Sequence, residues 1–182
     1  MFSDLLQGSV LIGILYSGIR LAAPYLFAAL GETVAQRSGV LDLGVEGIML
    51  MGSFIAFYIV FKTGNLWLGV GGAIAVGMLM GLLMSVISVT FQAEQGISGI
   101  GLYLFGLGLS SLLFRIMIGS VEGVTGFQPL PVPVLSKIPV IGEIFFNHNI
   151  MVYLAYVMVI LFALLLSKTT LGLKIRAVGQ NP

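Results

Sequence analysis

Cysteine is absent from the 182-residue chain, histidine occurs once, and charged residues make up only 8% of it. Without cysteine there is no disulfide framework, thiolate metal site or cysteine nucleophile. The single histidine, His148, argues against a histidine-based metal centre, so we expect neither a metal nor a cofactor. Lys and Arg number 8 against 7 Asp and Glu, and this near balance argues against nucleic acid as a partner.

Apolar residues are what the chain has in excess, at 58% of the sequence. A soluble domain carries about 45–50% apolar and about 25% charged residues, so this composition excludes an ordinary soluble enzyme. A membrane-crossing helix needs about 20 mostly apolar residues. The sequence therefore predicts an all-α, polytopic membrane helix bundle with about five spans, at Val10–Ala29, Val40–Phe61, Leu66–Phe91, Ile97–Ile118 and Ile150–Ser167.

The basic residues of the short connections predict how the spans are oriented. Cytoplasmic connections carry an excess of Lys and Arg. This rule places the tail that begins at Lys168, the connection at Arg37 and the connection at 92–96 inside, and the turn at Lys62 outside.

Asp42 and Glu46 are spaced four residues apart, which places them on one face if the helix begins at Val40, and Ser53 continues that face. Carboxylates within a span usually face the bundle interior or an aqueous path, and Gly44 would weaken the helix there. The alternative is that both carboxylates cap the helix start at the cytoplasmic interface, where the helix dipole favours them. The sequence leaves these two interpretations open.

The third span carries small residues at a strict four-residue spacing, at Gly69, Ala73, Gly77, Gly81 and Ser85. Such a stripe allows another helix backbone to approach closely. We therefore predict a helix–helix seam along it. Within the first span, Arg20 is costly to insert in lipid, so we expect it to pair with an acid such as Glu32, Asp42 or Glu46.

Catalytic and nucleotide-binding motifs are missing from the sequence. There is no phosphate-binding glycine loop that ends in Lys-Ser or Lys-Thr, no HExxH, and no serine or cysteine nucleophile with a histidine nearby. The chain is therefore predicted not to be an enzyme, and any ATP that drives it would be hydrolysed by another subunit.

Three collinear motifs carry a family resemblance. Residues 37–54 (RSGVLDLGVEGIMLMGSF) resemble the signature of ABC-importer permeases of the nucleoside and simple-sugar type, within the branched-chain amino acid/ribose permease family. Residues 97–115 are similar to the family's fourth span, and residues 171–182 (LGLKIRAVGQNP) to its cytoplasmic motif.

The resemblance implies a permease subunit of a binding-protein-dependent importer in the bacterial-type inner membrane. Its expected partners are a second permease subunit, cytoplasmic ATP-binding subunits, an extracytoplasmic substrate-binding protein and membrane lipid. The implied substrate pathway comprises Asp42, Gly44, Glu46, Ser53 and Tyr103, and the implied coupling residues are Gly172, Lys174, Arg176, Gly179 and Asn181.

The chain departs from the family in three respects. Many relatives carry Asn in place of Asp42 and an amide residue in place of Tyr103, so the resemblance does not identify the cargo. Such permeases are also longer, so we expect residues 1–182 to form a single but C-terminally truncated permease domain, with a cytoplasmic coupling segment over 168–182. The alternative function is an ion-coupled secondary transporter that uses Asp42 and Glu46.

Overall fold

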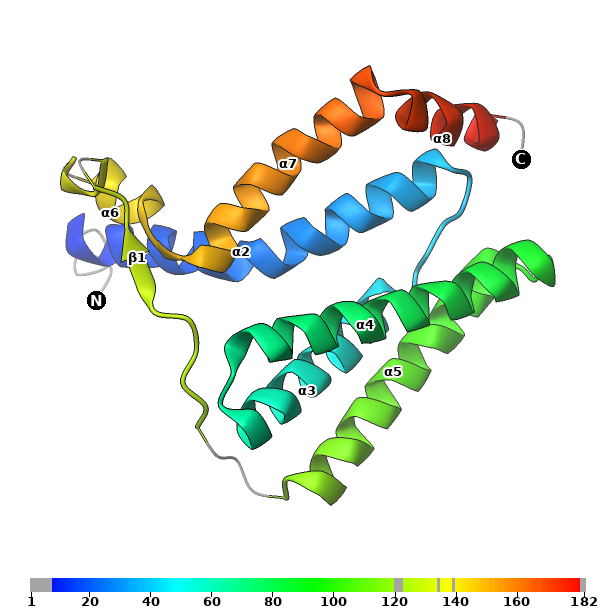
Figure 1. The fold of residues 1–182 in the computed structure, drawn as a ribbon, viewed down its shortest axis with the longest axis horizontal. Helices are drawn as coiled ribbons and strands as arrows, with labels where there is room; N and C mark the ends of the chain where they lie inside the picture. Colours follow the sequence, from blue (N-terminus) through cyan, green and yellow to red (C-terminus); the bar gives the residue numbers. More distant parts are fainter. Residues whose placement is uncertain (1–7, 120–122, 134, 139, 181–182) are drawn as a thin grey trace. The chain divides into compact units, whose positions relative to one another are not determined.

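The computed structural model describes residues 8–119, 123–133, 135–138 and 140–180. The described residues are mostly helical, and five of their helices are long and apolar enough to cross a membrane, as predicted. The long elements are α2 (Gly8–Arg37), α3 (Val45–Thr63), α4 (Leu66–Ser85) with its π-helical extension η1 (Val86–Thr90), α5 (Gln95–Met117) and α7 (Ile150–Lys168) (Figure 1). The shorter elements are β1 (Pro129–Pro131), η2 (Leu135–Lys137), α6 (Ile141–Phe145), β2 (Asn147–Asn149) and α8 (Thr170–Gln180).

Polar residues at the helix starts explain where the spans begin. The Asn65 side chain accepts hydrogen bonds from the amides of Trp67 and Leu68, at 3.0 and 3.3 Å, and caps α4. Glu94 caps α5 in the same way, and Asn149 caps α7. Each cap satisfies amide groups that have no partner within the helix, so the polar breaks in the sequence fix the span starts.

Two predicted boundaries are wrong, and both lie at the connection between the first two spans. The first helix runs to Arg37 instead of ending near Ala29, and the second begins at Val45 instead of Val40. Gly39 adopts a left-handed backbone with φ of 91°, which a helix does not allow. Asp42 therefore precedes α3.

Asp42 is consequently not on a helix face shared with Glu46. Its side chain accepts a hydrogen bond from the Gly44 amide at 2.7 Å, an Asx turn that competes with helix formation. Glu46 lies in the first turn of α3, where the helix dipole favours its charge.

The chain divides into two compact units. One contains residues 1–31 and 127–172, and the other contains residues 32–126 and 173–182. In the first unit, α2 and α7 pack together through Ala23, Val152 and Ala155. In the same unit β1 pairs antiparallel with β2, and the buried His148 ring stacks on Tyr16 with 4.6 Å between ring centroids.

The second unit is built from α3, α4 and α5. Its core consists of Met51, Met80, Met84 and Leu102. Val60 packs against Gly69, and Ile59 packs against Gly72, so α3 and α4 lie side by side as an antiparallel pair. Methionine fills irregular gaps between helices, which suits a core this thin.

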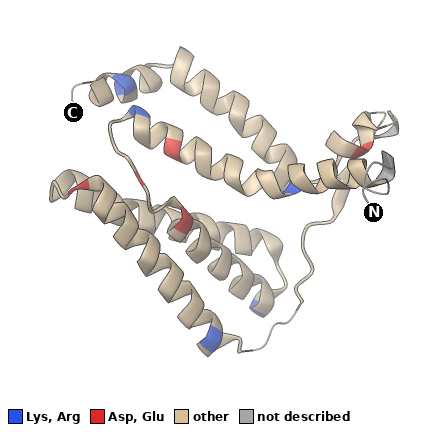
Figure 2. Cartoon of the chain, turned by 180° about the vertical axis from the view of Figure 1, so that it is seen from behind, with Lys and Arg blue, Asp and Glu red and all other residues tan. Residues whose placement is uncertain are grey.

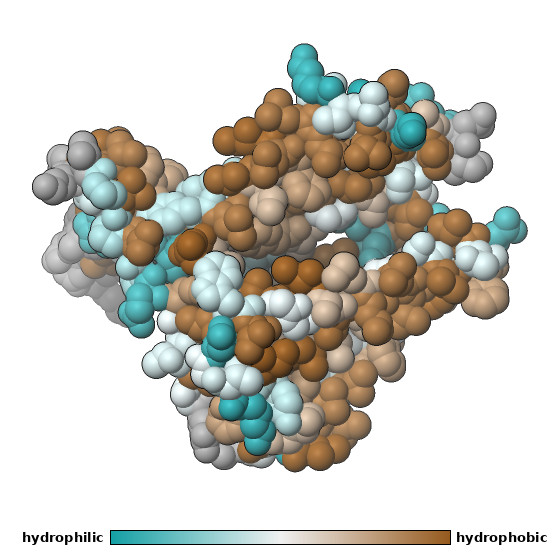
Figure 3. Space-filling model, in the orientation of Figure 1, coloured by the Kyte–Doolittle hydropathy of each residue, from teal (hydrophilic) through white to brown (hydrophobic). Residues whose placement is uncertain are grey.

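Large apolar side chains cover much of the surface (Figure 3). Leu82 is 66% exposed, Ile116 72% and Ile97 74%. Such exposure would be costly in water, but it is favourable against lipid or a partner helix.

Charged residues lie mainly at helix ends and in connections, but Arg20 lies inside α2 (Figure 2). It is exposed on that helix and forms no salt bridge within the described part of its own unit. The acids that the sequence suggested as its partners, Glu32, Asp42 and Glu46, belong to the other unit.

Candidate functional site

Glycines bring the first halves of α3 and α5 into backbone contact. A Cβ atom added at Gly47 would lie 2.7 Å from both Leu102 O and Tyr103 Cα. A Cβ at Gly106 would lie 2.6 Å from the carbonyl carbon of Gly47. Real Cβ atoms do not approach this closely, so only glycine fits at these positions. We call Gly44, Gly47, Gly99 and Gly106 the glycine seam.

The loop over residues 38–44 rests on the start of α5. The Leu41 amide donates to Gln95 Oε1 at 2.8 Å, and Gln95 Nε2 donates to the Gly39 carbonyl at 3.3 Å. A Cβ at Gly99 would lie 2.7 Å from the Leu43 amide nitrogen, so the loop lies directly against α5. Side-chain hydrogen bonds and close packing together hold the loop in one conformation.

Glu32 fixes the other side of this loop from the last turns of α2. Its Oε1 accepts hydrogen bonds from the Asp42 amide at 3.3 Å and from Gln36 Nε2 at 2.8 Å. Burial raises the pKa of the Asp42 carboxyl, and the hydrogen bond from the Gly44 amide opposes that rise. Asp42 thus stabilises the turn of the loop that precedes α3.

The α8 helix contacts the beginning of the same loop. A Cβ at Gly179 would meet the Arg37 carbonyl oxygen and would lie 3.0 Å from the Gly39 amide nitrogen. The structure therefore brings the end of α8, the loop at residues 38–44 and the start of α5 to one end of the second unit. The basic residues predict the same side of the membrane for these three stretches, and their assignment to the cytoplasm stays a prediction.

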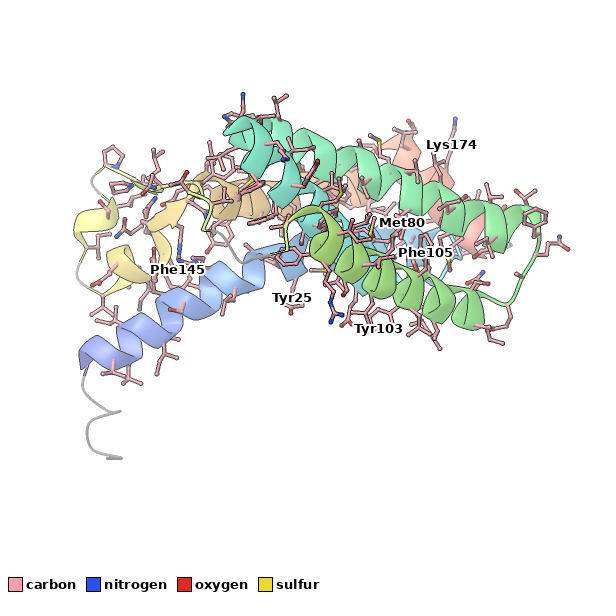
Figure 4. The ribbon with its side chains drawn as sticks, turned by 90° about the horizontal axis from the view of Figure 1, so that it is seen from below. Tyr25, Met80, Tyr103, Phe105, Phe145 and Lys174 are labelled. Atoms are coloured by element: carbon pink, nitrogen blue, oxygen red, sulfur yellow. The ribbon has the colours of Figure 1, made fainter. Side chains whose placement is uncertain are left out.

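The remaining predicted coupling residues lie along α8. Gly172 packs closely on the backbone of Leu165 and Leu166. Lys174 is exposed and points away from the helix (Figure 4), and Arg176 is partly buried. Asn181 lies outside the described residues.

The predicted pathway residues are brought together only in part. Gly44 lies in the glycine seam, and the backbone of Tyr103 lies against Gly47. Glu46 is exposed on the first turn of α3. Ser53 is exposed two turns further along, where it lines a groove between α3 and α5.

The small residues of α4 have different surroundings along the helix. Gly69 packs on Val60 and Ala56, and Ala73 lies 3.8 Å from the Cβ position of Gly52. Added Cβ atoms at Gly77 and Gly81 would have no neighbour within 4 Å, and Ser85 is exposed. Only the first two members of the stripe therefore face α3.

Sequence reasoning missed the residues of α5 and α2 that hold the loop. Gln95, Gly99 and Gly106 were not named as site residues, and Glu32 was considered only as a partner for Arg20. Gly99 and Gly106 are seven residues apart, two helical turns, so their shared helix face was a signal present in the sequence. The roles of Gln95 and Glu32 have no such signal, because hydrogen bonds over long sequence separations leave no periodic pattern.

Comparison with known proteins identifies the family of the chain. Residues 14–182 match the family described as branched-chain amino acid transport system / permease component. A putative glucose ABC transporter permease of Haloferax volcanii is 37% identical over an alignment of 174 residues, with 93% of this chain and 52% of the relative covered. A guanosine ABC transporter permease of Bacillus subtilis is 34% identical, with 88% of this chain and 54% of the relative covered.

A nucleoside ABC transporter permease of Lactococcus lactis is 32% identical, again over 88% of this chain and 54% of the relative. The chain thus spans about half the length of the curated relatives it matches. No solved structure matches it significantly. With its five membrane-length helices and its match over residues 14–182, the chain is a multi-pass membrane protein that belongs to the family of branched-chain amino acid transport system permease components.

Proposed function

We propose that the chain acts as a permease subunit of a binding-protein-dependent ABC importer for nucleosides or simple sugars. In this role it forms part of the translocation path together with a second permease subunit. Cytoplasmic ATP-binding subunits hydrolyse ATP, and an extracytoplasmic substrate-binding protein delivers the cargo. The observation that carries the proposal is the family match over residues 14–182.

The cargo class is taken from the relatives. Those described above are named as permeases for glucose, guanosine and nucleosides, and a fructose import permease of Bifidobacterium longum is 28% identical. These cargoes are neutral or weakly ionised hydroxylated ring compounds. No observation favours the ion-coupled alternative, since Asp42 is engaged in the turn that begins α3.

The contact between α8 and the loop supports a role in coupling. Gly172, Lys174, Arg176, Gly179 and Asn181 form the proposed contact segment for the ATP-binding subunit. Gly179 lies against Arg37 and Gly39, so a displacement of α8 either moves the loop with it or breaks this contact. The loop in turn lies on α5 through Gln95 and Gly99, so motion at the ATPase reaches the proposed path.

Reconstitution tests the proposal. The chain is purified in complex with a second permease subunit, ATP-binding subunits and a substrate-binding protein, the complex is placed in proteoliposomes, and uptake of labelled glucose, fructose and guanosine is measured. We expect uptake that requires ATP and the binding protein and is unchanged when proton and sodium gradients are collapsed. Uptake that follows an ion gradient without ATP would instead identify a secondary transporter.

A further inference from the structure

Beyond the glycine seam, the middle of α3 and the second half of α5 frame an open groove of about 440 Å³. Ligand pockets commonly measure about 300–1,000 Å³, so a small molecule fits a space of this size. Bulky side chains replace glycine here: Phe54 and Phe57 come from α3 and Phe114 from α5. Large side chains therefore line this part of the α3–α5 pair, whereas glycines line the seam.

The polar groups of the groove come from both helices. Ser53 lies on α3, while Ser110, Ser111 and Arg115 lie on α5. Ser110 Oγ donates to the Leu107 carbonyl at 3.2 Å, which leaves the lone pairs of its oxygen able to accept. The Arg115 guanidinium offers several donors in a fixed plane.

Aromatic rings supply the apolar part of the groove lining. The Phe57 and Phe114 rings lie 6.0 Å apart with an angle of 44° between their planes. An aromatic face suits the C–H face of a sugar ring or the π face of a base.

A group of serines and an arginine beside aromatic rings is unusual on a surface that faces lipid. Polar and charged side chains within spans usually face a bundle interior or a water-filled path. The serines and Arg115 all line one groove, so this side of the α3–α5 pair is the side suited to water and solute. The groove also lies further along both helices than the glycine seam, on the side away from the loop at residues 38–44.

We propose that this groove is a cargo-contact site for a neutral, hydroxylated ring, the sugar ring of a free monosaccharide or of a nucleoside. The inference rests on the proposed function, and it adds a location and a binding chemistry to it. Hydroxyl groups of the cargo bond to the serines and Arg115, and its flat face lies on the phenylalanines. An amino acid fits less well, because no carboxylate is present among the described lining residues to pair with its ammonium group.

Cysteine labelling tests the site directly, because the chain itself has no cysteine. Ser53→Cys and Ser111→Cys are introduced singly into the reconstituted complex and labelled with a membrane-impermeant maleimide. Thr63→Cys is the matched control, since Thr63 is exposed at the connection between α3 and α4 and does not line the groove. Cargo at ten times its dissociation constant should slow labelling at the two groove positions about tenfold and leave the control unchanged.

Comparing protection by different ligands shows which kind of cargo the groove binds. Protection by guanosine but not glucose assigns a nucleoside site, the reverse assigns a monosaccharide site, and either supports the inference. Protection by glucose 6-phosphate alone would overturn the neutral-ring assignment. Labelling of both groove positions that no cargo slows, or failure of both to label because a neighbouring subunit or lipid covers them, would overturn the inference.

A substitution pair separates this inference from the proposed function. Phe57→Leu keeps apolar bulk but removes a ring face, so we expect KM for uptake to rise about fivefold. Phe105→Leu, on α5 but outside the groove, should leave KM unchanged. Absence of ATP-dependent uptake by the wild-type complex rejects the proposed function, whereas normal uptake with equal KM for both variants rejects only the groove.

Discussion

The glycine seam yields the sharpest quantitative prediction, through the substitution Gly106→Ala. The added Cβ would lie 2.6 and 2.7 Å from the carbonyl carbon and Cα of Gly47. Carbon atoms pack best at about 3.5–4.0 Å, so the two helices must separate by about 1 Å. Because both obstacles are backbone atoms, no side chain can rotate away to relieve the clash.

The cost of this separation follows from close packing. Overpacking costs about 1–3 kcal/mol, and a gap of about 0.5–1 Å forfeits a quarter to a half of each dispersion contact along the seam. We therefore expect Gly106→Ala to lower the free energy of unfolding by about 2–3 kcal/mol. It should also weaken the contact of the loop at residues 38–44 with α5.

Gly108→Ala is the matched control on the same helix, because a Cβ there has no neighbour within 4 Å. Replacing a helical glycine by alanine gains up to about 1 kcal/mol when no clash occurs, so the control should be neutral or stabilising. Both variants are unfolded with SDS from mixed micelles and followed by circular dichroism. Equal stability of the two variants would refute the reasoning from the seam.

Three further predictions follow from other contacts. Gly179→Val should reduce ATP-dependent uptake severalfold while the complex still binds ATP. The control Ala177→Val, at an exposed position of α8, should leave uptake unchanged. Equal uptake by the two variants would show that the contact of α8 with the loop plays no part in coupling. Burial raises the pKa of Asp42 above its ordinary value of 3.8, so the folded state holds this proton more tightly than the unfolded state. The Asp42 carboxyl therefore stabilises the folded state most at acid pH, and this stabilisation declines as pH rises from 3.8 through the raised pKa. Asp42→Asn should flatten this part of the curve of unfolding free energy against pH. An unchanged slope would contradict the raised pKa of Asp42. Gly77 belongs to the α4 stripe of small residues but has no neighbour within 4 Å, so we expect the stripe to pack on the second permease subunit there. Gly77→Leu should then leave unfolding of the isolated chain unchanged but reduce co-purification with that subunit, whereas Gly71→Leu, outside the stripe, is the control. Full recovery of the Gly77→Leu complex would contradict this packing.

Much of the architecture could be predicted because each span carries its own signal. An apolar run of membrane length specifies a helix wherever it lies, and caps such as Asn65 and Asn149 lie next to the runs they begin. The connection near Gly39 was predicted wrongly because its backbone is fixed by a left-handed glycine and by the Asx turn at Asp42. Hydropathy does not report either feature.

The sequence by itself determined that this chain lies in a membrane, how many of its helices are long enough to cross it, and which family its motifs resemble. Those properties depend on local composition and order. Only the tertiary structure decided that Gly47 meets Gly106, that Gln95 holds the loop, and that α8 lies against Gly39. These contacts join segments more than fifty residues apart, and at that separation the three-dimensional packing of backbones, rather than any periodicity in the chain, selects the partners.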